Sequence, residues 1–329
     1  MAIVHGGDIF ALARERGWDW REVLDCSASI NPLGPAPGVQ AAICQAMERI
    51  VHYPEREPAP LRRALAQEWQ LDEEQILLGN GATDLIFFAA RILAHLPVTL
   101  GLPVFSEFNR AFPNAAHASL TNCASWPLSG LLVLTRPANP TGWTLSLEAI
   151  RAWLESTDTH LLIDESFLEF SERPSAAELI AGYPRRLIVM RSLTKFYALP
   201  GLRVGALIGS PEVVQAWRQQ REPWQVNVLA EAAALAALAD KEHALRSLEF
   251  MRSERASLAA QLNCAANDGN FLYVPLSYPA QNLCAHMLEH KILIRNCTGW
   301  PGLAGEAVRV AVRRRDENLR LLEAWRQFR

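Results

Sequence analysis

One lysine stands among side chains that could make it a covalent anchor for a small molecule. Lys195 follows Ser192 and Thr194 in the segment SLTK (192–195), and Arg203 comes eight residues later. A lysine amine is the side chain that forms an imine with an aldehyde cofactor. Ser192 and Arg203 at this spacing could hold one phosphate together, because a hydroxyl and an arginine fork both donate hydrogen bonds to its oxygens. A solvated surface lysine is the alternative for Lys195 taken alone.

A carboxylate closes one of the apolar runs of the chain. Asp164 ends the run LLID (161–164), where a charge is costly unless a cation or hydrogen bonds compensate it. A protonated pyridine nitrogen would be such a cation, and the pairing would turn the cofactor ring into an electron sink for a carbanion at an amino acid's α-carbon. An aspartate that merely caps the next helix is the alternative.

A glycine-containing turn precedes a predicted helix at GNGATD (79–84). Gly81, Ala82 and Thr83 could present backbone N–H groups to a phosphate at the helix N-terminus. The alternative is a turn that only supplies a Thr or Asp cap. The segment lacks the full GxGxxG spacing and the chain contains no GxxxxGK[ST], so the sequence does not favour a nucleotide-binding module.

The elements that must position these residues form an alternating pattern. Between about residue 76 and residue 210, short apolar runs alternate with helical stretches, which predicts an α/β fold with a mostly parallel sheet wrapped by helices. The expected strands cover 131–135, 161–165, 187–191 and 204–209, with a crossover helix at 146–157. Ligands of such folds bind beyond the carboxyl ends of the strands. We therefore expect RPANPTG (136–142), Asp164, SLTK and GNGATD to meet at one edge of the sheet.

After Pro211 the pattern changes to long helical segments, expected over 212–220 and 228–261, followed by short strands at 270–276, 291–296 and 307–312. This order is typical of a smaller α+β domain. We predict three parts: an N-terminal arm (1–40) that packs with the small domain, a large cofactor-binding domain (41–215) and the small C-terminal domain (216–329).

The bulk composition excludes several classes of function. The chain has 329 residues, half of them apolar, and a net charge of −3. Neither nucleic acid nor an anionic membrane surface would be attracted by such a charge, so any phosphate recognition must be local. The six cysteines lie far apart, with no CxxC pair and no His spacing that suggests a metal. No secretory signal and no uncharged apolar span is found, from which we expect a cytoplasmic protein.

Taken together, these segments resemble a known family. The set NPTG (139–142), Asp164, SLTKFYALPGLRVG (192–205) and VRV (308–310) is similar to the class I/II aminotransferase superfamily of pyridoxal-5′-phosphate (PLP) enzymes. The resemblance implies the PLP-dependent transferase fold of type I and a homodimer with shared active sites. Within that superfamily, the group that the chain resembles most is the threonine-phosphate decarboxylases of cobalamin biosynthesis, through the segments HGG (5–7), SINPLG (29–34), HYP (52–54) and REPWQVN (221–227).

The resemblance implies a role for each residue that matches the family's cofactor site. Lys195 would carry PLP as an imine, Asp164 would pair with the pyridinium, and Asn139 would bond the phenolic oxygen of the ring. Phe108 would stack on the ring face. Tyr53 would reach the cofactor phosphate of the neighbouring subunit. The phosphate within the same subunit would be held by Ser192, Arg203, Gly81, Ala82 and Thr83.

For the substrate, the resemblance implies that Arg309 clamps an α-carboxylate, a task suited to a bidentate fork. The residues that match the family's other substrate-contacting positions are His5, Gly6, Ser29, Asn139 and Arg295. The chain departs from the patterns at two places: Phe167 stands where histidinol-phosphate aminotransferases usually have a tyrosine, and Ser29 stands where the decarboxylases usually have an asparagine.

The implied activity is decarboxylation of L-threonine O-3-phosphate to (R)-1-aminopropan-2-ol O-2-phosphate. Histidinol-phosphate aminotransferase, or a related PLP-dependent aminotransferase, is the alternative with the same cofactor and the same Lys195. A catalytically silent scaffold of similar fold is a third possibility, but it would have no reason to keep Lys195, Asp164, Asn139 and Arg203 together.

Overall fold

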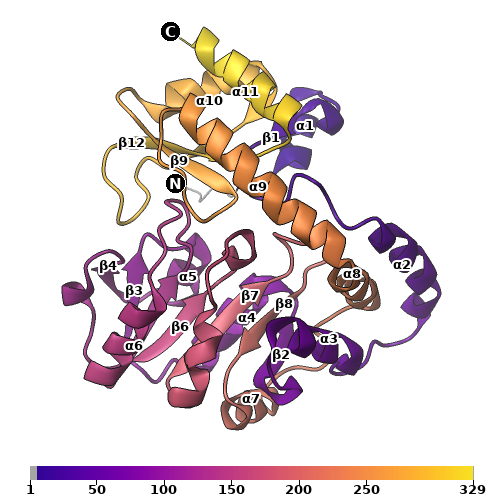
Figure 1. Ribbon diagram of the computed structural model, residues 1–329, viewed down its shortest axis with the longest axis vertical. Coiled ribbons are helices and arrows are strands. Elements are labelled where there is room, and N and C mark those ends of the chain that lie inside the picture. The colour runs from indigo at the N-terminus through magenta and orange to yellow at the C-terminus, as the bar shows by residue number, and fades with distance from the viewer. Residues whose placement is uncertain (1–5, 329) are drawn as a thin grey trace.

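The computed structural model describes residues 6–328 and has a lower and an upper part in the view of Figure 1. The lower part is built on a seven-stranded sheet. The upper part contains the C-terminal strands and helices together with the first helix of the chain, and the long helix α9 (Lys241–Gln261) runs from one part to the other.

The seven strands lie in the order β2-β8-β7-β6-β5-β3-β4. Their bounds are β2 (Ile76–Gly79), β3 (Val98–Leu102), β4 (Ala116–Ser119), β5 (Leu131–Thr135), β6 (His160–Asp164), β7 (Leu187–Ser192) and β8 (Gly205–Ile208). All neighbours pair in parallel except β8, which is antiparallel to both β2 and β7. The predicted mostly parallel sheet is confirmed. β8 runs the other way because the chain between β7 and β8 contains no crossover helix, which a parallel connection requires.

Helices cover both faces of this sheet, as the apolar strands require. Along β5, Leu131 and Val133 join a core cluster with α4 (Gly81–Ile92), α5 (Ser106–Ala111) and α7 (Pro211–Arg218), while Leu132 and Leu134 join the cluster on the opposite face with α6 (Leu147–Ser156). The helix expected at 146–157 is therefore confirmed. Ser146 caps it by accepting a hydrogen bond from the Ala149 N–H.

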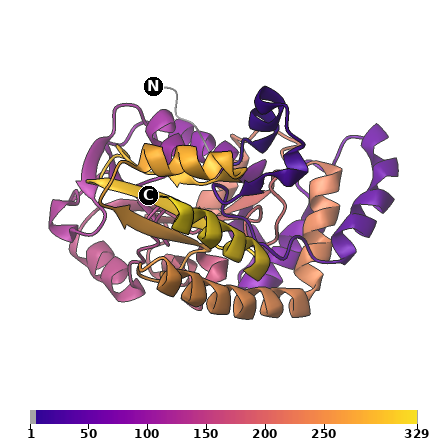
Figure 2. The same cartoon turned by 90° about the horizontal axis from the view of Figure 1, so that it is seen from above.

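The helical run expected over 228–261 is two helices, α8 (Val228–Ala239) and α9. Asp240 separates them, with a non-helical backbone (φ −89°, ψ 80°) and a side chain that accepts a hydrogen bond from the His243 N–H at 2.8 Å. α8 packs against α2 (Gly38–Ala46) and α3 (Ala59–Trp69). α2 and α8 lie side by side at one end of the molecule in both views (Figures 1 and 2).

The C-terminal part contains an antiparallel sheet of order β11-β12-β9, formed by β9 (Phe271–Leu276), β11 (Arg295–Asn296) and β12 (Glu306–Ala311). The strand expected at 291–296 is split, because β10 (Ile292–Leu293) pairs instead with β1 (Leu24–Asp25) of the N-terminal segment. The helices α1 (Ile9–Arg16), α10 (Ala280–Glu289) and α11 (Arg315–Gln327) complete this part. The domain limits given above stay predictions.

Short 3-10 helices connect these elements at Trp20–Glu22, Met47–Val51, Glu73–Gln75, Cys123–Ser125, Leu168–Phe170 and Ala176–Gly182. The apolar stretch around residues 85–105 is divided between α4 and β3. None of the helices within residues 6–328 is both long enough and apolar enough to cross a bilayer.

Candidate active site

A cavity of about 230 Å³ lies where the carboxyl ends of β5, β6 and β7 face the C-terminal sheet. It brings together most of the residues that the sequence singled out, from segments as distant as the N-terminal arm and β12. The predicted residues that line it are Gly6, Ser29, Ala82, Thr83, Asn139, Asp164, Ser192, Lys195, Arg203, Arg295 and Arg309. The parallel strands explain this convergence, because their carboxyl ends share one edge of the sheet.

Four predicted residues are not among those lining the cavity. Gly81 lies directly against the guanidinium of Arg203, which itself lines the cavity. The side chain of Phe108 is fully buried in the core between α4 and the sheet, so it does not present a ring to the cavity; Phe105, just before α5, lines the cavity instead. Tyr53 is 82 % exposed and stacks on Trp224 with ring centroids 4.9 Å apart. His5 lies outside the described residues.

Asp164 sits at the end of β6 with one carboxylate oxygen engaged. Ser166 donates to its Oδ1 from both the backbone N–H (2.9 Å) and the hydroxyl. Residues 6–328 offer no hydrogen bond to Oδ2. Burial raises the pKa of Asp164, while the two bonds from Ser166 and the charge of Lys195 oppose that rise. The free oxygen is thus available to a cationic partner within the cavity.

Lys195 extends from the loop after β7 into the same cavity. Its backbone carbonyl accepts a hydrogen bond from the Asn31 N–H at 3.0 Å, which ties the loop to the N-terminal segment. Desolvation, followed by the charges of Arg309 and Arg203, lowers the pKa of Lys195 from 10.5 to about 8. A large share of the amine is therefore neutral, and so nucleophilic, at mildly alkaline pH.

An anion cradle is formed at the N-terminus of α4. Gly81 has a φ of +79°, and a Cβ at this position would lie 2.5 Å from Nη2 of Arg203. Only glycine allows this guanidinium to come so close to the start of the helix. Ser192 and Thr194, which share a hydrogen bond of 2.7 Å between their hydroxyls, line the same cavity, and Ser192 pairs across the sheet with Gly205, which lies against Gly81 and Ala82. These donors fit a phosphate group at a helix N-terminus, as PLP would provide.

Arg309 and Asn139 contact each other in the lining of the same cavity. The Arg309 guanidinium donates from Nη1 to Asn139 Oδ1 and from Nη2 to the backbone carbonyl of Ser27. Its Nε is buried and without a partner in the described chain, as is the Ser29 hydroxyl. Nδ2 of Asn139 remains available to a ligand. Sequence analysis missed Ser27, whose hydroxyl also accepts the Gly7 N–H at 3.0 Å and donates to Asp25 at 2.6 Å.

The charges around the cavity are strongly unbalanced. Its lining holds four cationic side chains, Lys195, Arg203, Arg295 and Arg309, and a single carboxylate, Asp164. Arg295 and Arg309 are directly opposite one another on β11 and β12. Cross-strand pairing of like charges is unfavourable unless an anion lies between or beside them. This arrangement suits the binding of small molecules that together carry several negative charges.

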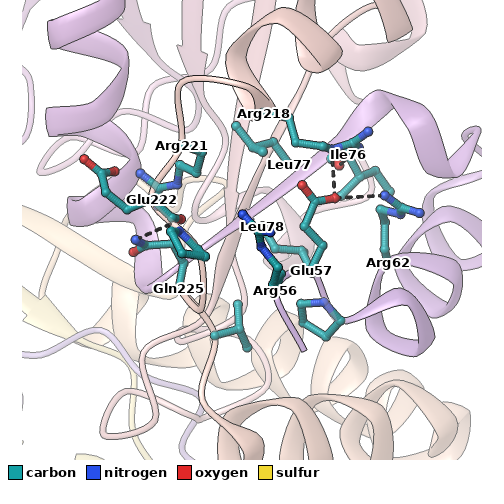
Figure 3. Close-up of a pocket in the computed structure, with 13 residues that line it drawn as sticks. Arg56, Glu57, Arg62, Ile76, Leu77, Leu78, Arg218, Arg221, Glu222 and Gln225 are labelled. Atoms are coloured by element: carbon teal, nitrogen blue, oxygen red, sulfur yellow. Dashed lines mark hydrogen bonds and ion pairs between the residues drawn. The ribbon is translucent and has the colours of Figure 1, made fainter. Parts of the chain in front are cut away.

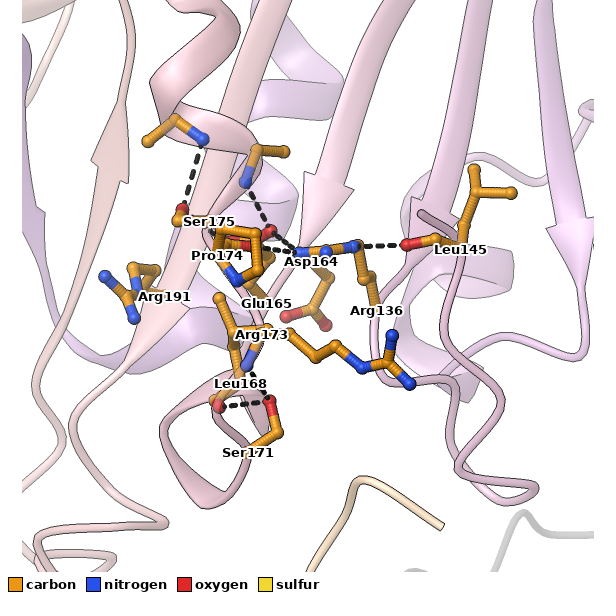
Figure 4. A network of polar contacts seen from close by, with 12 residues as sticks. Arg136, Leu145, Asp164, Glu165, Leu168, Ser171, Arg173, Pro174, Ser175 and Arg191 are labelled. Carbon is orange, nitrogen blue, oxygen red and sulfur yellow. Dashed lines mark hydrogen bonds and ion pairs between the residues drawn. The ribbon is translucent and has the colours of Figure 1, made fainter. Parts of the chain in front are cut away.

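Behind Asp164 lies a buried ion pair that the sequence did not reveal. Nη1 of Arg136 donates to Glu165 at 2.8 Å, and the two side chains are 2 % and 0 % exposed. Glu165 also accepts the Ala176 N–H and the Ser175 hydroxyl, while Arg136 donates to the carbonyls of Leu145 and Pro174. Figure 4 shows this network on the sheet side of Asp164. It fixes the ends of β5 and β6, from which Asn139 and Asp164 extend.

A second, smaller cavity of about 80 Å³ lies near β2 and is also rich in arginine. Here three of the four arginines are already paired: Glu57 contacts both Arg62 and Arg218 (Figure 3), Arg218 also contacts Glu74, and Arg221 contacts Asp84. The same Asp84 accepts the Asn80 N–H at the start of α4. Because carboxylates pair with these three arginines, most of the positive charge of this cavity is compensated, unlike that of the first.

Known proteins of one family are similar to this chain over most of its length. Residues 21–324 match the family model for aminotransferase class I and II. The chain is 33 % identical to threonine-phosphate decarboxylase of Salmonella typhimurium, with 98 % of this chain and 95 % of the relative covered. It is 32 % identical to histidinol-phosphate aminotransferase 2 of Pseudomonas fluorescens, with 98 % and 94 % covered.

A solved structure shares the fold: histidinol-phosphate aminotransferase from Sinorhizobium meliloti in complex with pyridoxal-5′-phosphate, with a TM-score of 0.84, 24 % identity, and coverage of 98 % of this chain and 94 % of that one. The expected PLP-dependent transferase fold is confirmed. On these grounds the chain belongs to the class I and II aminotransferase family, whose cofactor is pyridoxal 5′-phosphate.

Proposed function

We propose that this protein uses PLP to decarboxylate L-threonine O-3-phosphate, giving (R)-1-aminopropan-2-ol O-2-phosphate for cobalamin biosynthesis. The observation that carries the proposal is the charge of the cavity. Arg203 and the N-terminus of α4 would hold the cofactor phosphate. Within residues 6–328, neither Arg295 nor Arg309 forms an ion pair with a carboxylate, although the more distant charge of Asp25 acts on Arg309. L-Threonine O-3-phosphate carries one carboxylate and one phosphate, an anion for each of these two arginines.

Bound PLP supplies an electron sink for the electron pair left at the substrate α-carbon when a bond to it breaks. In our proposal Asp164 keeps a proton on the pyridine nitrogen through its free Oδ2, and Asn139 donates from Nδ2 to the ring's phenolic oxygen. Lys195 anchors the cofactor and afterwards returns a proton to the α-carbon, a role suited to a pKa of about 8.

The bond that breaks is chosen by orientation. Arg309 would hold the carboxylate so that its bond to the α-carbon stands perpendicular to the cofactor ring, the only direction in which that bond overlaps the electron sink. Arg295 would hold the substrate phosphate. Phe105 would take the ring-stacking role that the resemblance assigned to Phe108; in support, it is Phe105 that lines the cavity.

We further propose a homodimer with shared active sites. Tyr53 is 82 % exposed, and among the described residues only Trp224 stacks on its ring. Met47, Ile50 and Val51, just before it, are also exposed. Exposed apolar side chains gathered within one short segment in this way are typical of a subunit interface. Tyr53 would then reach the cofactor phosphate in the neighbouring subunit.

The competing function is histidinol-phosphate aminotransferase, since relatives with that name are nearly as similar. The PLP-loaded protein should release carbon dioxide from O-phospho-L-threonine with no keto acid added. Amino transfer from histidinol phosphate to 2-oxoglutarate, without carbon dioxide release from phosphothreonine, would overturn the proposal. The variant K195A serves as the control for cofactor-dependent turnover in both assays.

A further inference from the structure

Trp300 lies on a glycine-rich loop that crosses from the C-terminal sheet to the edge of the cavity. The loop joins β11 to β12 and carries glycines with positive φ at 299, 302 and 305. At Gly302 a Cβ would lie 2.4 Å from the Leu102 Cβ, so the loop touches the end of β3. The indole N–H of Trp300 donates to the carbonyl of Val104 at 3.1 Å. Two contacts thus fasten this loop to the segment that continues into Phe105 and Ser106 of the cavity wall.

The guanidinium of Arg295 lies over the face of the same indole ring. The Arg295 Cζ lies 5.3 Å from the ring centroid of Trp300, within the range of a cation–π interaction. Both residues line the cavity and both are partly buried. With its N–H held by Val104, the ring has a fixed plane, and this plane limits where the guanidinium can lie.

Arg295 needs such support, because no group within residues 6–328 accepts a hydrogen bond from its guanidinium. No carboxylate from residues 6–328 contributes to its electrostatics, and Arg309, its cross-strand partner, repels it. Arg309, by contrast, is held by Asn139 and Ser27. An arginine side chain left free would lose considerable rotamer entropy on binding an anion.

We propose that Trp300 is a positioning residue that holds the Arg295 guanidinium toward the distal phosphate of the substrate and so sets the preference for phosphorylated substrates. This inference rests on the proposed function only in assigning a substrate phosphate to Arg295. It applies equally to O-phospho-L-threonine and to histidinol phosphate, since both carry that group.

The test is a double-mutant cycle with W300L, R295Q and R295Q/W300L in the PLP-loaded protein. For each variant kcat/KM is measured with the phosphorylated substrate that the wild type turns over and with the same compound lacking phosphate, L-threonine or histidinol. The ratio of the two values is the phosphate preference. W126F is the matched control, because the Trp126 indole also donates to a backbone carbonyl, that of Ser119 at 2.8 Å, but lies in the core away from the cavity.

We expect W300L to lower the phosphate preference roughly 3- to 30-fold through KM, with little change for the unphosphorylated compound. W300F, which keeps an aromatic face, should retain most of the preference, and W126F all of it. In the R295Q background, W300L should have no further effect. If W300L does not fold, W300M, whose longer and unbranched side chain can adapt to the space left by the indole, takes its place in the cycle.

Two results would overturn the inference: an equal loss for both substrates in W300L, or a full additional loss of preference when W300L is added to R295Q. Either would mean that Trp300 acts on the site without Arg295. An unchanged phosphate preference in R295Q itself would instead mean that Arg295 does not bind the substrate phosphate, contrary to what the proposed function assumes. The two failures are therefore distinguishable.

Discussion

Arg309 on β12 donates a hydrogen bond to the side chain of Asn139 in the loop after β5, residues 170 positions apart in the chain. This contact joins the C-terminal sheet to the carboxyl edge of the large sheet. The second amino group of Arg309 is held by the Ser27 carbonyl, so its guanidinium has one orientation, with the buried Nε unpartnered. A planar fork held in this way can recognise a carboxylate in a single geometry.

Replacing Arg309 with lysine tests this geometry. R309K keeps the charge but cannot contact Asn139, Ser27 and a carboxylate at once, so KM should rise about tenfold to a hundredfold, the loss expected for charge-assisted hydrogen bonds. Steady-state kinetics of carbon dioxide release measure it. R313K is the control, since Arg313 pairs with Glu317 outside the cavity. Equal KM values for R309K and the wild type would refute the carboxylate role.

Much of this site was predictable because its residues stand at strand ends. Asp164 closes β6, Lys195 follows β7 and Asn139 follows β5, and parallel strands bring their carboxyl ends to one edge without further information. The apolar periodicity also located α6 and four of the seven strands of the large sheet, β5 to β8. Local sequence pattern and family resemblance together were sufficient to predict the cofactor and the fold.

The parts that were missed depend on contacts between distant segments. Phe108 and Phe105 differ by three positions, and only the packing of α5 decides which of them faces the core. The Arg136–Glu165 pair and the Trp300–Val104 hydrogen bond have no periodic signature. The break at Asp240 is a local cap inside an otherwise helical pattern, which hydrophobic periodicity does not detect.

The lowered pKa of Lys195 predicts how the apoprotein captures its cofactor. Since only the neutral amine attacks the aldehyde, the capture rate should rise about tenfold for each pH unit below the pKa and level off above it. The midpoint should lie near pH 8. Stopped-flow absorbance of apoprotein mixed with PLP at several pH values measures the rate. The titration of PLP itself is removed by dividing by the rate constant of a free lysine derivative expressed per neutral amine, so that only the titration of Lys195 remains. A midpoint near 10.5 would contradict the prediction, and K195A should show no borohydride-trappable product.

A methyl group at Gly81 should disrupt the anion cradle. In G81A the new Cβ would collide with the Arg203 guanidinium, and alanine would be held at a φ of +79°, which is strained for any residue with a Cβ. We expect PLP affinity to fall at least about tenfold. The backbone strain alone costs about 1 to 2 kcal/mol, and about 1.4 kcal/mol corresponds to a tenfold change in the dissociation constant. Titration of apoprotein with PLP measures the dissociation constant. The control is G182A, where no atom lies within 4 Å of the added methyl group; similar affinities for both variants would exclude the cradle.

Mixed dimers test whether Tyr53 acts across the subunit interface. Y53A and K195A should each be weakly active or inactive as homodimers. When the two variants are unfolded and refolded together, a mixed dimer contains one site with an intact Lys195 and an intact Tyr53 from the other chain, so about a quarter of all sites should recover by random pairing. Turnover by the mixture, compared with the sum of the separate variants, measures the recovery. No recovery, with mixed dimers demonstrated by mass spectrometry, would place Tyr53 outside the shared site.

The buried pair behind Asp164 should matter for stability more than any surface pair. E165Q removes the charge that compensates Arg136 but keeps the size of the side chain, which leaves a guanidinium buried at 2 % exposure without a counter-ion. Breaking a buried pair in this way typically lowers the free energy of unfolding by about 3 to 5 kcal/mol. The Arg185–Glu212 pair, 75 % and 71 % exposed, provides the control, because E212Q should change that free energy by less than about 1 kcal/mol. Urea unfolding of the PLP-loaded protein compares the two. If E165Q unfolds at the same urea concentration as E212Q, the pair is not what fixes the ends of β5 and β6, and the support of Asp164 must come from its bonds to Ser166 alone.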